Sequence, residues 1–328
     1  MTSATAGTEI IAKAIHLACR APSLHNSQPW RWIVGEAAVD LFVDHERVVR
    51  SADRSGREAI ISCGAALDHF QIAMAAAGWK TDVDPFPNPS DRDHLASLDV
   101  TPAHEVSTID RDRADAILKR RTDRLPFHKP SHWDSFEPKL CNTIDRGKAT
   151  LDVLADEARP ALAQASRLTE SFRRRDEYYR DELHWWTDPL RLYQGVRPSA
   201  LVSEDESERV GFNREFPPVT RHGDRCCDIQ LDEAKVLVLS TPDKTRADAL
   251  NCGAALSTVL LECTMVGLAT CTVTHITESA DGRAVIQELT GGRAFPQLLI
   301  RVGTASALEE TPAPTPRRPS SEIMQIRR

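Results

Sequence analysis

An arginine-rich run at residues 120–124, Arg-Arg-Thr-Asp-Arg, holds side chains that suit an anion. It follows a helical pattern of apolar residues and precedes Pro126, so we expect a helix end that passes into extended chain. In an extended chain Arg120, Thr122 and Arg124 point the same way, and two guanidinium groups beside a hydroxyl suit a phosphate dianion. The alternative is a solvated basic helix terminus, which the helix dipole favours.

A second basic pair, Arg317 and Arg318, lies within a Pro-Arg-Arg-Pro segment near the C-terminus. It is a second candidate for the same anion. An ordinary solvated tail is the alternative, and the pair by itself does not decide between the two.

Short polar side chains gather in a proline-bounded turn at residues 21–30, Ala-Pro-Ser-Leu-His-Asn-Ser-Gln-Pro-Trp. The turn follows a predicted helix over 8–21, which Thr8 can cap and Pro22 ends. Amide and hydroxyl groups of this kind match the carbonyl and N–H edges of a ring such as a flavin. The alternative is a structural turn whose Ser and Asn side chains satisfy backbone groups.

The remaining chemistry-bearing residues form no convincing catalytic or metal constellation. The sequence has no Gly-x-Ser-x-Gly elbow, no His-Glu-x-x-His and no glycine-rich phosphate loop. His222, Cys226, Cys227 and Asp228 could be read as a metal cluster, but adjacent cysteines poorly suit one tetrahedral site. We therefore predict neither a catalytic side chain nor a metal.

The most informative internal feature is a repeat. Cys-Gly-Ala-Ala-Leu at 63–67 recurs at 252–256, and a glycine follows each copy at the same distance, Gly78 and Gly267. Corresponding positions are 189 residues apart, and the apolar residues between them fall on one helical face. Two copies favour an internal pseudo-dimer of buried helices, and chance similarity of two alanine-rich helices is the alternative.

Apolar runs and alternation predict strands that would form sheets beside these helices. The predicted strands cover 30–34, 39–43, 235–240, 268–276 and 296–303. The stretch 171–218 differs in composition, since it holds all three tyrosines, Trp185, Trp186 and many charges. We interpret it as an insertion that is either a lid or part of the scaffold.

Composition narrows the partners of the chain. With 328 residues it is long enough for about two domains. The 41 basic and 48 acidic side chains give a formal charge of −7 with no basic stripe, so we expect no nucleic-acid or membrane partner. Eight cysteines without a CxxC pair, and no export signal, favour a cytoplasmic protein.

The motifs taken together resemble those of the FMN-dependent nitroreductase family. They are the turn at 21–30, the run at 120–124, Gly-Leu-x-Thr-Cys at 267–271 and Pro-Arg-Arg-Pro at 316–319. The resemblance is closest to the dormancy-associated, nitroreductase-like proteins of actinobacteria and covers nearly the whole chain.

The resemblance implies an α+β, nitroreductase-like fold with central antiparallel or mixed sheets and buried helices. Its two related halves, 1–108 with the turn and 109–328 with the arginine run, would be fused as an internal pseudo-dimer that holds one FMN. A monomer is then plausible. The resemblance implies cofactor contacts from Pro22, Ser23, Leu24, His25, Asn26, Gln28, Arg120, Arg121, Thr122, Arg124, Thr272, Val273, Thr274, Arg317 and Arg318.

The implied reaction is hydride transfer from NAD(P)H through FMN N5 to a nitroaromatic, quinone or similar small-molecule acceptor. One departure affects this expectation, because Thr272–His275 stands where many family members have Pro-x-Glu-Gly. If the insertion at 171–218 closed over the flavin, the chain would store or sequester FMN. A module that has lost the cofactor is a more distant alternative.

Overall fold

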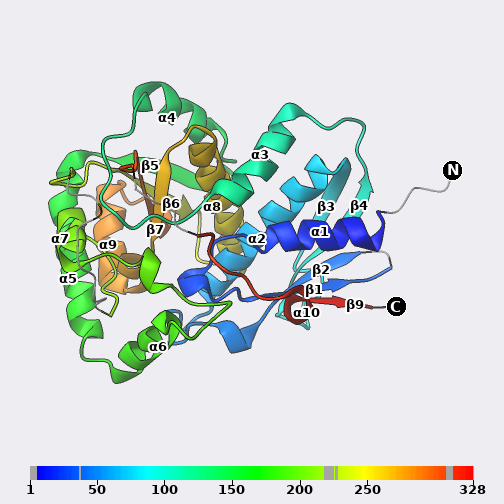
Figure 1. The fold of residues 1–328 in the computed structure, drawn as a ribbon, viewed down its shortest axis with the longest axis horizontal. Coiled ribbons are helices and arrows are strands. Elements are labelled where there is room, and N and C mark those ends of the chain that lie inside the picture. Colours follow the sequence, from blue (N-terminus) through cyan, green and yellow to red (C-terminus); the bar gives the residue numbers. More distant parts are fainter. Residues whose placement is uncertain (1–5, 37, 218–224, 226–227, 308–312, 328) are drawn as a thin grey trace. The chain divides into compact units, whose positions relative to one another are not determined.

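The chain, seen in a computed structural model, is described over residues 6–36, 38–217, 225, 228–307 and 313–327. It divides into two compact units (Figure 1). Unit 1 comprises Met1–Arg120, Thr245–Leu261 and Pro316–Arg328, and unit 2 comprises Arg121–Lys244 and Glu262–Thr315. The boundary between related halves after residue 108 stays a prediction, because this division follows spatial contacts and not repeats.

The sheet of unit 1 has five strands in the order β3-β4-β2-β1-β9. Strands β1 (Trp30–Val34) and β2 (Val39–Val43) are antiparallel, which confirms the two predicted strands. Strand β9 (Met324–Ile326), from the C-terminal end, pairs parallel with β1, so this sheet is mixed. The remaining two strands are β3 (Trp79–Pro85) and β4 (His94–Pro102).

The helices of unit 1 include α1 (Thr8–Ala18), α3 (Thr108–Lys119) and the short α10 (Ser320–Ile323). The predicted cap of α1 is wrong, since Gly7 is the N-cap and no side chain caps this end. The helix also ends at Ala18, earlier than predicted. Ala21 directly precedes Pro22, and a residue before proline disfavours the helical conformation.

The repeated segments form two helices of equal length, α2 (Arg57–Ala76) and α8 (Arg246–Met265). Both ends of α8 lie 189 residues after those of α2, as predicted for the repeat. By length and composition α2 could cross a membrane, but 72% of that stretch is buried. It is therefore a core helix of unit 1.

The sheet of unit 2 has four antiparallel strands in the order β5-β6-β8-β7. Strands β6 (Lys235–Thr241), β7 (Ala269–Val273) and β8 (Phe295–Gly303) confirm three predictions, and β5 (Thr150–Leu154) was not predicted. Strand β7 is shorter than expected because a 3-10 helix begins at His275.

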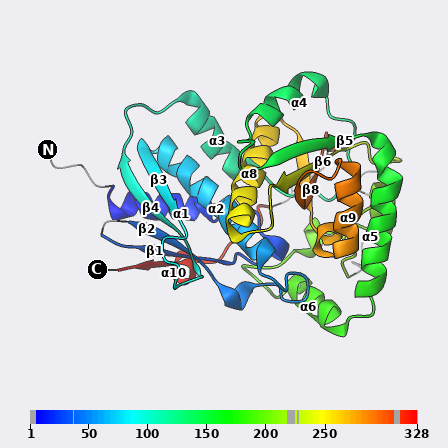
Figure 2. The same ribbon diagram turned by 180° about the vertical axis from the view of Figure 1, so that it is seen from behind.

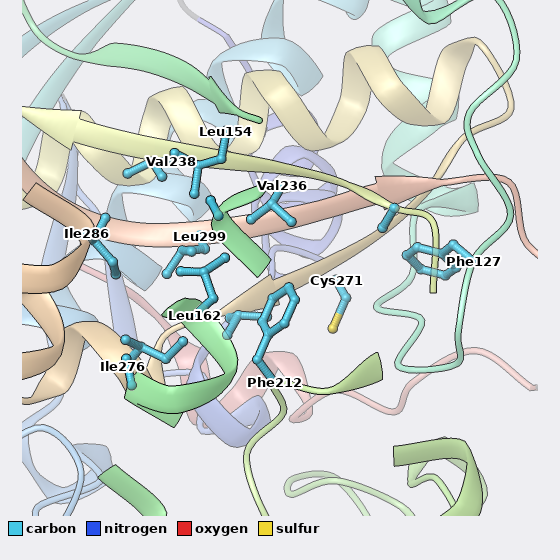
Figure 3. Close-up of a cluster of buried hydrophobic side chains, with 14 residues drawn as sticks. Phe127, Leu154, Leu162, Phe212, Val236, Val238, Cys271, Ile276, Ile286 and Leu299 are labelled. Carbon is cyan, nitrogen blue, oxygen red and sulfur yellow. The ribbon is translucent and has the colours of Figure 1, made fainter. Parts of the chain in front are cut away.

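Helices α5 (Arg159–Arg173) and α9 (Ala280–Leu289) lie side by side in both views of unit 2 (Figures 1 and 2). Leu162 of α5 and Ile286 of α9 join Leu299 of β8 in one buried apolar cluster (Figure 3). The other α-helices described in this unit are α4 (Trp133–Asn142), α6 (Glu177–Thr187) and α7 (Glu204–Val210). The predicted α+β class, with antiparallel and mixed sheets and buried helices, is confirmed.

Candidate functional site

The polar turn between α1 and β1 has an unusual backbone. His25, Asn26 and Gln28 have φ angles of 51°, 56° and 53°, in the left-handed region that few residues other than glycine adopt. Within the turn, the Gln28 N–H donates to Ser23 Oγ at 3.0 Å, and Gln28 Nε2 donates to the Asn26 carbonyl at 3.2 Å. Backbone strain of this kind persists where surrounding contacts hold it, and it concentrates at functional sites.

The C-terminal segment supplies some of those contacts. Asn26 Nδ2 donates to the Pro316 carbonyl at 3.2 Å, and the Arg318 N–H donates to Gln28 Oε1 at 2.9 Å. Arg318 Nη1 also donates to the Gln28 carbonyl at 3.3 Å and lies 3.6 Å from an Asp44 carboxylate oxygen. Gln28 and Arg318 therefore fix the turn, and their predicted contacts with a cofactor remain predictions.

Arg317 has a structural role at the end of α1. Its Nε donates to the Cys19 carbonyl at 2.8 Å, and its Nη2 donates to the carbonyls of Arg20 and Ala21 at 2.9 and 3.2 Å. The Cys19 carbonyl, at the C-cap of α1, has no partner inside the helix, and the guanidinium satisfies it together with the next two carbonyls of the chain. Residues of the two predicted halves, 1–108 and 109–328, thus meet inside unit 1.

Arg120, the last residue of unit 1 before the chain passes into unit 2, is buried at the C-terminus of α3. Its Nε and Nη1 atoms have no hydrogen-bond partner in the described part of the chain. Burial, together with the charge of Arg20, lowers the pKa of Arg120 to about 10. A buried donor without a partner is costly, so Arg120 is well placed to receive an anion.

Arg20, Arg120 and Arg317 form what we call the arginine cluster of unit 1. Burial lowers the pKa of Arg317 well below its usual range, and the charges of Arg20 and Arg120 lower it further. His69 of α2 faces the same charges, and burial, Arg120 and Arg317 all lower its pKa. Arg20 was not among the predicted site residues, because it belongs to none of the motifs and no local pattern marks it.

The rest of the arginine run, residues 121–124, belongs to unit 2 and lies beside the start of β7. Thr122 forms a parallel bridge with Thr270, and the Asp123 N–H donates to the Thr270 carbonyl at 2.9 Å. Thr272 and Val273 follow on the same strand, with Thr274 just after it. The structure thus brings two predicted site segments together, while Arg121 is exposed.

Arg124 contacts the predicted insertion within unit 2. Its Nη1 donates to the Ala200 carbonyl at 3.4 Å, and its guanidinium carbon lies 5.3 Å from the centre of the Phe216 ring. Burial lowers the pKa of Arg124, while nearby Cys271 acts in the opposite direction. The stretch 171–218 therefore covers part of this arginine.

The insertion also contacts the residues that follow β7. Arg214 Nη2 donates to Thr274 Oγ1 at 3.1 Å, and Arg214 pairs with Glu278. The Thr274 hydroxyl donates to Glu278 Oε1 at 2.8 Å, and Arg173 pairs with the same carboxylate. Burial opposes ionisation of Glu278, but Arg214 and Arg173 lower its pKa below the usual range. We call this group the Glu278 network.

Glu170 lies next to the Glu278 network, but its carboxyl group differs from that of Glu278 in protonation. Its carboxylate lies 3.5 Å from Arg173 Nη1, and its Oε1 has no hydrogen-bond partner in the described part of the chain. Burial raises the pKa of Glu170 to about 7, although Arg214 and Arg173 act to lower it. The Glu278 carboxyl is therefore ionised near neutral pH, whereas the Glu170 carboxyl is partly protonated.

The aromatic residues of the insertion divide into two groups. Tyr179 and Trp186 are buried within unit 2, and the Trp186 carbonyl accepts from the Val196 N–H at 2.7 Å. Tyr178 and Tyr193 are exposed, with 85% and 53% of their surface accessible. Part of the insertion is therefore scaffold, whereas its role as a lid over a flavin stays a prediction.

The candidate metal cluster lies mostly outside the described residues, which leave out His222, Cys226 and Cys227. Asp228, which is described, accepts from Ser306 Oγ at 3.0 Å and lies 2.9 Å from His128 Nε2. No group of metal-ligating side chains occurs among the residues that the structure describes.

Comparisons with known proteins agree with the motifs. The model of the family described as "Nitroreductase family" matches residues 147–304. A Mycobacterium tuberculosis protein named "Putative NAD(P)H nitroreductase acg" is 53% identical over 320 residues, which is 98% of this chain and 96% of the relative. Another from the same organism, "Putative NAD(P)H nitroreductase Rv3131", is 36% identical over 97% of this chain and 91% of the relative.

Among solved structures, the FMN-dependent nitroreductase NfnB from Mycobacterium smegmatis, in complex with NADPH, is 16% identical. The match covers 67% of this chain and all of that one, with a TM-score of 0.42. The family is shown by the two relatives, which align over more than nine tenths of their length. The chain belongs to the nitroreductase family.

Proposed function

We propose that this chain binds one FMN molecule and acts as an NAD(P)H-dependent oxidoreductase of the nitroreductase type. The observation that carries the proposal is Arg120, a buried cation whose Nε and Nη1 have no protein partner in the described residues. A phosphate dianion accepts hydrogen bonds from such a group through charge-assisted contacts. The names of the relatives, which include NAD(P)H nitroreductases, agree with this assignment.

The residues of the chain would hold the cofactor in two ways. Arg120, Thr122 and Arg124 would bind the phosphate, as the family resemblance implies. Ser23, His25 and Asn26 would face the ribityl chain and the ring, on a turn whose strained backbone is fixed by the C-terminal segment. Bound FMN would supply hydride chemistry at N5, so the protein needs to contribute binding, orientation and exclusion of water.

A second candidate function is storage of FMN with little or no turnover. It is favoured by the contacts of the insertion with two predicted site segments, since Ala200 and Phe216 cover Arg124 and Arg214 binds Thr274. A flavin enclosed in this way would lack the open face on which nicotinamide and acceptor alternate. The acceptor in the first proposal would be a nitroaromatic, a quinone or a similar small molecule.

Anaerobic mixing of FMN-loaded protein with NADPH or NADH separates the two functions. Loss of flavin absorbance within seconds supports the oxidoreductase, provided that free FMN in the same buffer stays oxidised over that time. Absorbance that persists for hours contradicts the oxidoreductase and supports storage. Protein that takes up no FMN at all contradicts both.

A further inference from the structure

We propose that residues 213–217 form a strap that controls access of the cofactor to Arg124, and that ionisation of Glu170 opens this strap. The inference rests on the proposed FMN-binding function and concerns how that site is regulated. The strap follows Phe212, whose side chain is fixed in the buried apolar cluster of unit 2 (Figure 3). Phe216, within the strap, covers Arg124, with 5.3 Å between its ring centre and the guanidinium carbon.

The side chain of Arg214 holds the strap closed. Its Nη1 donates to Tyr179 Oη at 2.9 Å, and its Nη2 donates to Thr274 Oγ1 at 3.1 Å and to the Glu278 carboxylate. The Arg214 side chain is 7% exposed and that of Glu278 is 2% exposed. Lifting the strap away from Arg124 therefore requires that a buried ion pair breaks.

Glu170 of α5 lies beside this ion pair without a donor for one of its oxygens. It is buried, and its Oε1 has no hydrogen-bond partner in the described part of the chain, although Arg173 Nη1 is 3.5 Å away. The guanidinium of Arg173 is already committed to Glu278 and to Tyr179 Oη. Because a buried carboxylate without donors is costly, the closed strap favours the protonated form of Glu170.

The charges around Glu170 agree with this geometry. Burial raises the pKa of Glu170 to about 7, against the charges of Arg214 and Arg173, and an open strap would let water return the pKa towards 4.5. Burial raises the pKa of Tyr179 and lowers that of His275, so both stay neutral between pH 6 and pH 8. The titratable and charged groups near Glu170 are Arg173, Arg174, Tyr179, Arg214, Glu215, His275 and Glu278.

The direction of the pH effect follows from the raised pKa. The protonated carboxyl stabilises the closed strap fully below about pH 4.5, and this stabilisation is lost as the pH rises through about 7. A pKa of about 7 in the closed state and 4.5 in the open state shifts the equilibrium towards opening by roughly tenfold between pH 6 and pH 8. The chain would therefore retain FMN at low pH and exchange it faster at high pH.

The test compares rates of FMN release from wild type and Glu170→Gln at pH 6 and pH 8. Recovery of FMN fluorescence after dilution of the loaded protein measures each rate. The variant cannot ionise at this position, and any effect of pH on FMN itself is common to both proteins. The ratio of the wild-type rate to the variant rate should rise by roughly tenfold from pH 6 to pH 8. The control is Glu208→Gln, on the exposed surface of α7, which should release FMN as wild type does.

A second measurement on the same full-length proteins needs no flavin. Trypsin cleaves after arginine, and the closed strap buries the Arg214 side chain, so cleavage at this bond reports opening of the strap. Mass spectrometry follows the cleavage at pH 6 and pH 8. The ratio of the wild-type rate to the Glu170→Gln rate should again rise with pH, whereas the ratio for Glu208→Gln should stay constant.

The outcomes separate this inference from the proposed function. Cleavage and release ratios that are both constant with pH overturn the role of Glu170. A cleavage ratio that rises while the release ratio stays constant overturns control of the cofactor, because the strap then opens without affecting FMN. Wild-type protein that takes up no FMN refutes the proposed function, and the cleavage ratio still decides whether Glu170 opens the strap.

Discussion

The Cα atom of Gly253 lies 3.0 Å from the position that a Cβ atom on Gly64 would occupy. That Cβ would also collide with the carbonyl oxygen of Leu250. Helices α2 and α8 therefore cross in unit 1 at a point where neither backbone leaves room for a side chain.

The contact is reciprocal. A Cβ on Gly253 would collide with the carbonyl oxygen of Ile61 and lie 2.8 Å from the Cα atom of Gly64. Ile61 and Leu250 are themselves 189 residues apart, as Gly64 and Gly253 are. Equivalent positions of the two copies thus approach each other, as in an isologous dimer interface, while the pseudo-dimer and the monomeric state stay predictions.

Replacing either glycine of this crossing should destabilise the fold. Gly64→Ala and Gly253→Ala each place a methyl group against backbone atoms that cannot rotate away, so we expect a loss of about 1–3 kcal/mol or more in the free energy of unfolding. Urea denaturation measures it. The control is Gly7→Ala, where an added Cβ meets nothing within 4 Å. Equal stability of all three variants would contradict the close crossing.

The arginine run should govern FMN affinity through Arg120. Arg120→Ala removes the buried donors, and a charge-assisted contact contributes roughly 1.5–3 kcal/mol, so we expect about 10- to 100-fold weaker FMN binding. Combining it with Arg124→Ala should cost several kcal/mol. Fluorescence titration with FMN measures both, and the control is Arg111→Ala, which removes a charge from the exposed surface of α3. Unchanged affinity in the double variant would show that the phosphate binds elsewhere.

Glu170 should make stability depend on pH. Its pKa is raised from 4.5 to about 7 in the folded chain, so the folded state holds this proton at pH values where the unfolded state has lost it. That contribution is complete below about pH 4.5 and is lost as the pH rises through about 7. Glu170→Gln should remove this pH-dependent loss of folding stability.

The measurement for Glu170 is the unfolding free energy of Glu170→Gln relative to wild type at several pH values. We expect the difference to move in favour of the variant between pH 5 and pH 8, because all other groups titrate in both proteins. Glu208→Gln, on the exposed surface of α7, is the control for loss of one carboxylate. A difference in unfolding free energy that stays constant with pH would contradict the raised pKa of Glu170.

Arg214 should anchor the insertion to the residues after β7. Arg214→Gln leaves the buried Glu278 with one fewer cation, and breaking a buried ion pair costs about 3–5 kcal/mol. The control is Arg174→Gln, whose pair with Glu215 is exposed and worth about 1 kcal/mol or less. If urea denaturation finds equal losses in both variants, the Glu278 network does not hold the insertion.

Local patterns predicted much of the fold because periodicity reports burial directly. The repeated apolar face predicted α2 and α8 but not where they begin, and Gly78 and Gly267 both have positive φ, 86° and 78°, after the two helices. Strands β1 and β2 match their predicted ranges. Strand β9 was missed, since three residues near a terminus carry no periodic signal and pair only with distant β1.

The site was predicted less completely, for a similar reason. Motifs pointed to the turn and to both arginine segments, but they did not indicate that Arg317 binds the carbonyls at the end of α1 or that Arg318 binds Gln28. These contacts join residues nearly 300 positions apart. Arg20 was missed because its significance comes from neighbouring arginines that are remote in the chain.

The number of FMN molecules bound at saturation tests the central claim most directly. The turn is present once in the chain, and so is the arginine run, so equilibrium dialysis of purified protein against excess FMN should yield one FMN per polypeptide. Saturation at two FMN per polypeptide, or no binding, would contradict a single site built from two unlike halves.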